Sequence, residues 1–441
     1  MQTIIKPNKS QWPLISKRPG INAKDLSNTV SNILSTVKKD QDKALFAMAQ
    51  KYDNAKIDNL KVSEEEINSA LKNIDPALKK AIDLARKNIT KFHQSQIVKE
   101  EIVETTKGVT CWRKTIAIEK VGLYIPGGSA PLFSSILMLG IPAKIAQCKE
   151  IIICTPANKE GKIDNALLYT AATIGIRNIY KVGGSQAIAA MAYGTQSVPA
   201  VNKIFGPGNQ YVTEAKRLIQ KDGIAIDMPA GPSEVLIIAD ETSVPAFIAA
   251  DLLAQAEHGP DSQVMLLSNK QEVIDKTLKA LDVQLVNLPR QDIATRALRN
   301  SKAILLDSIQ DCIAFSNEYA PEHLIIATEK LIDYIGDIQN AGSVFLGNYS
   351  CESAGDYASG TNHTLPTNGY AKNYSGVSLD SFVKKITFQR LSREGLSNIG
   401  PSIEKMASAE QLYGHKNAVT IRLEKLNEGA EAVKEQIITQ A

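Results

Sequence analysis

The sequence lacks several features that would assign it at once to a class of protein. No run approaches the roughly 20 apolar residues that a bilayer-spanning helix needs, and the first 20 residues contain no apolar segment typical of a secretory signal. Lysine and arginine (50) nearly balance aspartate and glutamate (47), so the net charge does not indicate a nucleic-acid-binding protein. We therefore expect a soluble cytoplasmic protein that binds neither membrane nor nucleic acid.

Cysteine is also scarce, and no pair forms the C-x-x-C spacing of a redox or zinc motif. An odd, dispersed set of five indicates reduced thiols in a cytosol-like compartment. We interpret them as buried thiols and assign no catalysis to them. The five are Cys111, Cys148, Cys154, Cys312 and Cys351.

The 441 residues and an apolar content of 44% favour more than one folded domain. Residues 25–100 show the spacing of amphipathic helices, beginning with Leu26 and Val30. Ser63 and Glu66 have the spacing of a capping box, and Pro76 marks the start of a further helix. Helices should therefore precede the first strand-rich region.

Short apolar segments alternate with helical segments from about residue 105 onward. This rhythm occurs twice and predicts two parallel sheets covered by helices. The first set of expected strands is 121–128, 150–156, 179–184 and 202–209. The second set is 233–240, 262–269, 302–308, 323–328 and 342–348.

The predicted fold class is α/β, with two Rossmann-like parallel-sheet domains, a helical N-terminal arm and a helical C-terminal extension. We expect the arm to cover residues 1–24. Residues 105–233 form the first α/β domain, and residues 25–104 join 234–378 in the second. Residues 379–441 are expected to be helical.

Three glycine turns, "PGGS", "VGGSQ" and "FGPGN", end strands of the first set. Glycine at the carboxyl end of a parallel strand lets backbone N–H groups approach a ligand, although such turns favour glycine in any case. The dinucleotide fingerprint G-x-G-x-x-G is absent. Its nearest approach is residues 206–211, where Tyr211 takes the place of the third glycine. The P-loop pattern is absent too, which argues against an ATP-driven enzyme.

The chain has only five histidines, and four of them lie in dense polar segments. His93 is expected to be solvated at a polar helix end. Gln255 and His258 are three residues apart in a helical stretch and therefore share a face, which fits either a metal site or an ordinary helix end. The polar segments hold His258, His323, His363 and His415.

Two further segments carry groups suited to acid–base or metal chemistry. Glu322 and His323 stand side by side at the start of a strand, where a carboxylate and an imidazole can act as paired general bases. Asp356 and His363 lie in a Gly/Ser-rich segment that can deliver ligands to zinc. Spacing alone indicates only a possible His/Asp metal site.

Seven long segments, in unbroken order from about residue 10 to 425, resemble those of the histidinol dehydrogenase family, which has an aldehyde dehydrogenase-like architecture. They are "VGLYIPGGSAPLFSS", "KIFGPGNQYVTEAKR", "IDMPAGPSEVLIIAD", "LLAQAEHGPDSQ", "APEHLII", "GSVFLGNYSCESAGDYASGTNHTLPT" and "HKNAVTIR".

The resemblance implies a zinc-dependent four-electron oxidation of L-histidinol through L-histidinal to L-histidine, with reduction of two NAD. His323, neutral near pH 7, would take the hydroxyl proton, and Glu322 would activate the water that attacks the aldehyde. The zinc ligands carry over as Gln255, His258, Asp356 and His415.

Further positions carry over to the substrate, the cofactor and a second subunit. Ser233 and Glu410 match substrate-binding positions, as do the zinc ligands and His323. NAD would contact Tyr124, Gln186 and Asn209, one on each glycine turn. The family is a homodimer whose C-terminal segment completes the neighbouring site.

Two other functions remain open from the residues alone. An aldehyde dehydrogenase-like enzyme would need a thiol in its cleft, for which Cys111 and Cys148 are the only candidates near the first α/β domain. A protein that only binds a metal or a nucleotide would not need the bases Glu322 and His323.

Overall fold

A computed structural model describes residues 1–19, 23–127, 131–330 and 332–439. The chain forms two units, Met1–Ile97 with Ala117–Phe382 and Val98–Ile116 with Val383–Ala441. Residues 128–129 of the "PGGS" turn and residues 20–22 of the expected arm lie outside the described part. Among the described residues, no helix is both long and apolar enough to cross a membrane.

The first unit contains a five-stranded parallel sheet, which confirms the first predicted set of strands. Its order is β6-β5-β4-β7-β8, and every pair runs parallel. The strands are β4 (Lys120–Tyr124), β5 (Glu150–Thr155), β6 (Ile179–Lys181), β7 (Lys203–Phe205) and the short β8 (Ala225–Ile226), which was not predicted.

The same unit contains a six-stranded parallel sheet of order β1-β11-β10-β9-β12-β13. All five strands of the second predicted set are confirmed, and the N-terminal residues add an edge strand that the sequence reading missed. The strands are β1 (Gln2–Ile5), β9 (Glu234–Ala239), β10 (Gln263–Ser268), β11 (Lys302–Leu305), β12 (His323–Ala327) and β13 (Ser343–Leu346).

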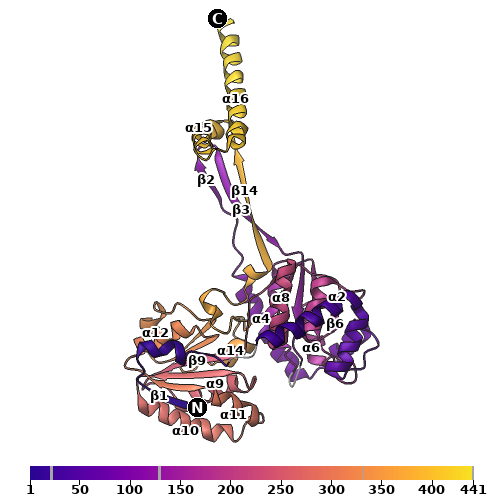
Figure 1. Ribbon diagram of the computed structural model, residues 1–441, viewed down its shortest axis with the longest axis vertical. Coiled ribbons are helices and arrows are strands. Elements are labelled where there is room, and N and C mark those ends of the chain that lie inside the picture. The colour runs from indigo at the N-terminus through magenta and orange to yellow at the C-terminus, as the bar shows by residue number, and fades with distance from the viewer. Residues whose placement is uncertain (20–22, 128–130, 331, 440–441) are drawn as a thin grey trace. The chain divides into compact units, whose positions relative to one another are not determined.

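Helices cover both faces of the five-stranded sheet (Figure 1). Alternate strand residues point to opposite faces, so Leu123 packs in one core and Tyr124 in the other. The helices are α2 (Ala23–Asp53, interrupted at Gln41), α3 (Glu64–Asn73), α4 (Pro76–Gln94), α5 (Ser134–Ile145), α6 (Asn165–Thr173), α7 (Gly184–Tyr193) and α8 (Gln210–Ile219).

The helices of residues 25–104 do not pack on the second sheet, as was expected. Helix α2 packs on α7 and α8, α3 on α6, and α4 on α5, so all three belong to the five-stranded sheet. Val30 of α2 lies in the same core as Ile152 of β5. Periodicity predicts that such a helix has an apolar stripe but does not identify the sheet that receives it. The capping box of Ser63 and Glu66 is confirmed.

The six-stranded sheet is also covered on both faces. Ile237 of β9 packs in one core with α9, α10 and α11, whereas Leu236 packs in the other with α1 and α12. The helices are α1 (Trp12–Ile15), α9 (Pro245–Ala256), α10 (Gln271–Leu285), α11 (Gln291–Arg299), α12 (Ile309–Tyr319), α13 (Ile332–Ile335) and α14 (Glu352–Tyr357). The unit also contains 3-10 turns at Lys9–Gln11, Gln220–Asp222, Tyr370–Lys372 and Leu379–Phe382, of which the second packs on α8 and the last on α5.

The second unit contains a three-stranded sheet of order β14-β3-β2, formed by β2 (Ile102–Thr106), β3 (Val109–Ala117) and β14 (Val383–Leu391). Strands β2 and β3 are antiparallel. Helices α15 (Arg393–Ala409) and α16 (Tyr413–Thr439) follow and pack together. The expectation that residues 379–441 are entirely helical is therefore wrong for β14, whose partner strands come from a distant part of the sequence.

A buried ion pair holds one turn of the five-stranded sheet. Lys216 and Asp227 are in contact, and their side chains are only 4% and 1% exposed. The Lys216 ammonium donates to the carbonyl of Gly206 at 3.0 Å, and the Gly206 amide donates to Asp227 at 2.8 Å. Both hydrogen-bonding groups of this glycine are thus fixed by the same pair.

We predict that Lys216→Met destabilises the fold strongly, because buried Asp227 then loses its contacting counter-charge and keeps only the more distant charge of Lys203. Removing one partner of such a pair costs about 3–5 kcal/mol, which urea-induced unfolding followed by circular dichroism measures. Arg217→Ala is the matched control: it removes a pair with Glu214 from the same helix, but Arg217 is 57% exposed, so we expect a loss of about 1 kcal/mol or less. Equal losses in the two variants would contradict this account.

Candidate active site

The predicted acid–base pair lies at the amino edge of the six-stranded sheet. His323 is the first residue of β12 and Glu234 the first of β9, and these strands are parallel neighbours. Helix α9 follows β9 and ends at Ala256, next to Gln255, so the chain returns to the same edge. Open parallel sheets usually bind ligands at the carboxyl edge, whereas here the reactive side chains gather at the opposite one.

The Glu322 carboxylate is held by two N–H donors. The backbone amide of Glu234 donates to its Oε2 at 2.8 Å, and the Gln255 side-chain amide lies 3.3 Å from the same oxygen. Glu322 is only 7% exposed. Two donors on one oxygen fix the carboxylate in one orientation, as a positioned general base requires.

The imidazole of His323 is fixed through one nitrogen and leaves the other for chemistry. Its Nδ1 lies 3.2 Å from the carbonyl oxygen of Glu234, an arrangement that favours the tautomer with the proton on Nδ1. Its Nε2 is buried without a hydrogen-bond partner and lies 3.5 Å from an Asp356 carboxylate oxygen. His323 therefore presents a free ring nitrogen toward Asp356.

Electrostatics at His323 differ from the expectation that it is neutral near pH 7. Burial alone lowers the pKa of the imidazole, but the carboxylates of Glu352, Glu322 and Asp356 outweigh burial and raise the pKa well above its usual value. These charges act here without a metal ion, so the neutrality of His323 in the metal-bound site stays a prediction. A divalent cation on these carboxylates would offset their negative charge and oppose this shift.

Three side chains on α14 and at the end of α9 could hold a metal ion. Ligand atoms of His258, Glu352 and Asp356 all lie within 4.8 Å of one another. One carboxylate oxygen of Glu352 and one of Asp356 are buried without a hydrogen-bond partner. Imidazole and carboxylate are both ordinary zinc ligands, so this donor set fits the ion that the sequence implies.

Glu352 was not predicted from the sequence. It is 1% exposed, and burial together with the charges of Asp356, Glu322 and Asp251 raises its pKa well above the usual value. The signal that could have revealed it is its spacing, since Glu352 precedes Asp356 by one helical turn and therefore shares its face. The raised pKa favours the protonated form of Glu352 in the absence of a cation, and a metal ion bound at such a site would favour release of that proton.

Two more predicted residues lie beside this cluster. The Gln255 side-chain nitrogen is 3.4 Å from Nδ1 of His323, and Gln255 is 1% exposed. Ser233 is half-buried directly before β9, where its carbonyl accepts from the Gln263 amide at 3.2 Å. The structure thus brings Gln255, His258, Glu322, His323 and Asp356 together.

The remaining histidines of this unit are held by backbone carbonyls through Nδ1 and by side chains through Nε2. His363 lies 2.9 Å from the carbonyl of Asp356 and 3.1 Å from the Ser135 hydroxyl, and burial lowers its pKa. The expectation that His93 is solvated is wrong: it is 0% exposed, and its Nδ1 lies 2.9 Å from the carbonyl of Ile89. The residues next to His93 in the sequence are polar, but His93 itself lies on the buried face of α4.

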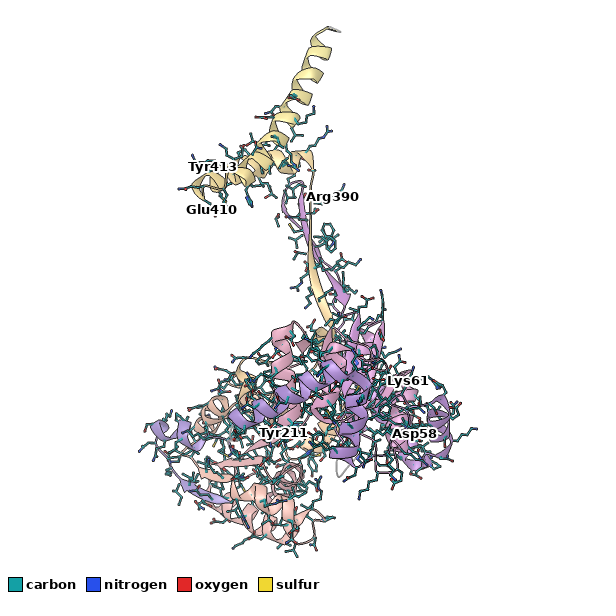
Figure 2. All side chains as sticks on the ribbon, turned by 45° about the vertical axis from the view of Figure 1, so that its right-hand side comes forward. Asp58, Lys61, Tyr211, Arg390, Glu410 and Tyr413 are labelled. Atoms are coloured by element: carbon teal, nitrogen blue, oxygen red, sulfur yellow. The ribbon has the colours of Figure 1, made fainter. Side chains whose placement is uncertain are left out.

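Two predicted residues belong to the second unit. Glu410 follows α15 directly, and His415 lies in the first turn of α16. Both are exposed in this chain, and Figure 2 labels Glu410 beside Tyr413.

The predicted cofactor contacts lie at the carboxyl edge of the five-stranded sheet. Tyr124 ends β4 and its hydroxyl accepts from the Gly184 amide at 3.0 Å, while Gln186 lies in the first turn of α7. Asn209 caps α8 by accepting from the amide of Tyr211 at 3.0 Å; Figure 2 labels Tyr211.

The turns at this edge leave no room for a side chain. A Cβ on Gly206, whose φ is +124°, would lie 2.0 Å from the carbonyl oxygen of Tyr124. Helix α7 has Gly183 as its N-cap and no side-chain cap from that position; the Tyr124 hydroxyl binds its first amide, that of Gly184. Close backbone approach and a glycine N-cap at a helix N-terminus fit the phosphates of a dinucleotide.

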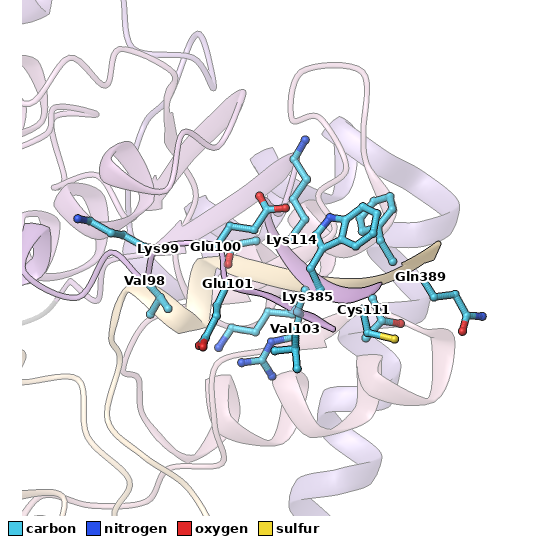
Figure 3. A pocket seen from close by; sticks show the side chains of 14 residues that line it. Val98, Lys99, Glu100, Glu101, Val103, Cys111, Lys114, Lys385 and Gln389 are labelled. Atoms are coloured by element: carbon cyan, nitrogen blue, oxygen red, sulfur yellow. The ribbon is translucent and has the colours of Figure 1, made fainter. Parts of the chain in front are cut away.

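The thiols do not support a cysteine nucleophile. Cys148 is buried against the carbonyl of Phe382, and burial raises its pKa to about 11. Cys111 lines a cavity of about 770 Å³ in the second unit, formed by residues of β2, β3 and β14 and by the segment before β2 (Figure 3), which contains none of the predicted catalytic or metal-binding residues. A thiolate nucleophile needs a lowered pKa in an accessible site.

The chain is similar to known proteins over most of its length. The family model described as histidinol dehydrogenase matches residues 16–423. The chain belongs to the histidinol dehydrogenase family. A histidinol dehydrogenase of Bacteroides fragilis is 55% identical over 97% of this chain and 100% of its own length. One of Aliivibrio fischeri is 51% identical over 97% of both chains.

A solved structure extends the likeness to three dimensions. The crystal structure of histidinol dehydrogenase from Elizabethkingia anophelis matches with a TM-score of 0.95 and 58% identity, over 97% of this chain and 99% of that one. The histidinol dehydrogenase family membership therefore covers both units of the chain.

Proposed function

We propose that this chain is an NAD-dependent histidinol dehydrogenase that oxidises L-histidinol through L-histidinal to L-histidine. The observation that carries the proposal is the juxtaposition of Glu322 and His323 with the donor cluster of His258, Glu352 and Asp356 at one sheet edge. Its reduced, unpaired cysteines are consistent with action in the cytoplasm.

Zinc would be held by Gln255, His258 and Asp356, with His415 as a further ligand. A bound zinc ion would supply a Lewis acid for the nitrogen donors of the substrate. Histidinol offers two such donors, an imidazole and an amine. Ser233 and Glu410 would complete the substrate contacts.

In the first step His323 accepts the hydroxyl proton of histidinol at Nε2 while hydride leaves the carbon atom. Its Nδ1 keeps a proton facing the Glu234 carbonyl, which stabilises the ring in either protonation state. In the second step Glu322 accepts a proton from the water that attacks the aldehyde, and the hydrate then loses hydride to give the acid. NAD accepts one hydride in each step, bound near Tyr124, Gln186 and Asn209.

We further propose a homodimer in which His415 and Glu410 complete the site of the neighbouring subunit. Their exposure on a separate unit supports this, because a zinc ligand and a substrate contact need partners. Symmetric exchange of such a segment makes each site depend on both chains.

We predict that Glu322→Gln slows oxidation of histidinal at least tenfold more than oxidation of histidinol, because only the second step needs an activated water. Single-turnover assays of each half-reaction measure the two rates. His323→Gln serves as the comparison and should slow the first step more. Equal losses of both steps in Glu322→Gln would contradict the water-activating role.

We also predict complementation between two inactive variants, His323→Ala and His415→Ala. In a hybrid dimer, one site would combine an intact His323 from one chain with an intact His415 from the other. Hybrids isolated with two different affinity tags should have about half of the wild-type activity.

A hybrid of His323→Ala with Glu322→Ala is the control and should stay inactive, because both changes lie in the same unit of the chain. If the first hybrid were as inactive as its parents, His415 would act within its own chain.

A further inference from the structure

Arg18, near the N-terminus, contacts the first residue of β9 and the turn before β12, the two places that position the acid–base pair. Its guanidinium donates to both carboxylate oxygens of Glu234, at 2.5 and 2.9 Å. The side chains of Arg18 and Glu234 are 15% and 3% exposed. The backbone amide of Asn368 donates to the same carboxylate at 2.9 Å. A bidentate pair of this kind restrains position as well as charge.

Glu234 in turn contacts both catalytic side chains through its own peptide groups. Its amide donates to the Glu322 carboxylate at 2.8 Å, and its carbonyl lies 3.2 Å from Nδ1 of His323. A displacement of the first residue of β9 would therefore move the base and the imidazole together.

Arg18 also holds the turn that leads into β12. It donates to the carbonyls of Tyr319 and Ala320, at 2.8 and 3.4 Å, and its guanidinium lies 4.0 Å from the centre of the Tyr319 ring. Ala320 has a positive φ of 53°, which a residue with a Cβ adopts at a cost that its surroundings must offset. Glu322 follows this turn by two residues.

We propose that Arg18 is a positioning residue for catalysis, which sets Glu322 and His323 by bracing the entries of β9 and β12. The inference rests on the proposed function and extends it to a side chain outside the reacting groups. Arg18 makes its contacts with Glu234, Tyr319 and Ala320, and none of the proposed zinc ligands is among them. Its loss should thus impair both oxidation steps and leave metal binding intact.

The test uses Arg18→Ala and Arg18→Lys in the full-length protein. We expect kcat to fall about 10- to 100-fold for both histidinol and histidinal, as for small misplacements of catalytic groups, with KM within about threefold of wild type. Zinc content should remain that of the wild type. Arg18→Lys keeps the charge but not the paired geometry, so it should recover only part of the loss.

Chemical rescue separates positioning from general stability. Arg18 lines a cavity of about 570 Å³ together with Pro232 and Lys372, so added guanidinium can reach the space vacated in Arg18→Ala. We expect it to raise kcat of that variant severalfold. Arg217→Ala is the matched control, since it removes another bidentate pair, with Glu214, and should keep wild-type kcat.

Three outcomes overturn the inference. They are a kcat within twofold of wild type in both Arg18 variants, a loss of activity that follows loss of zinc, and a loss that guanidinium does not relieve at all. The wild-type enzyme is assayed first, because its failure to oxidise histidinol would refute the proposed function itself, whereas an active wild type with unaffected variants refutes only the role of Arg18.

Discussion

The backbone of Glu234, the first residue of β9, is the constraint from which the proposed active site is arranged. Its amide donates to the Glu322 carboxylate, which the Gln255 side chain also contacts, and its carbonyl faces one nitrogen of His323. Because β9 and β12 are hydrogen-bonded neighbours in a fixed register, the base and the imidazole cannot move independently. The geometry of the acid–base pair is thus a property of the sheet and not of a mobile loop.

The concentration of negative charge at this edge gives the site its chemical character. Glu322, Glu352 and Asp356 surround one imidazole in a buried setting, an arrangement that costs free energy unless a cation offsets it. The same charges that would bind zinc raise the pKa of His323 without it. Metal binding and the acid–base state of the site are therefore linked through shared electrostatics, and the opposite, carboxyl edge of the other sheet remains available for a dinucleotide.

Much of this could be predicted from the sequence, because strand and helix periods are local. The nine strands expected in the two parallel sheets are all present, as is the capping box at Ser63. The features that were not predicted from the sequence depend on contacts between distant segments. Strand β14 is recognised only by pairing with β3, and the burial of His93 is fixed by tertiary packing. Glu352 can be recognised as a metal-ligand candidate only once the short helix that carries it is placed beside His258. Its spacing to Asp356 alone does not distinguish it from other carboxylates.

Crystals of the zinc-loaded protein grown with L-histidinol would test the central claim directly, through an anomalous difference map at the zinc absorption edge. The account predicts one strong peak per subunit at the amino edge of the six-stranded sheet, about 2.0–2.2 Å from nitrogen or oxygen atoms of His258 and Asp356, with the substrate hydroxyl beside His323. A map with no peak at this edge, or with the ion bound elsewhere in the chain, would contradict it.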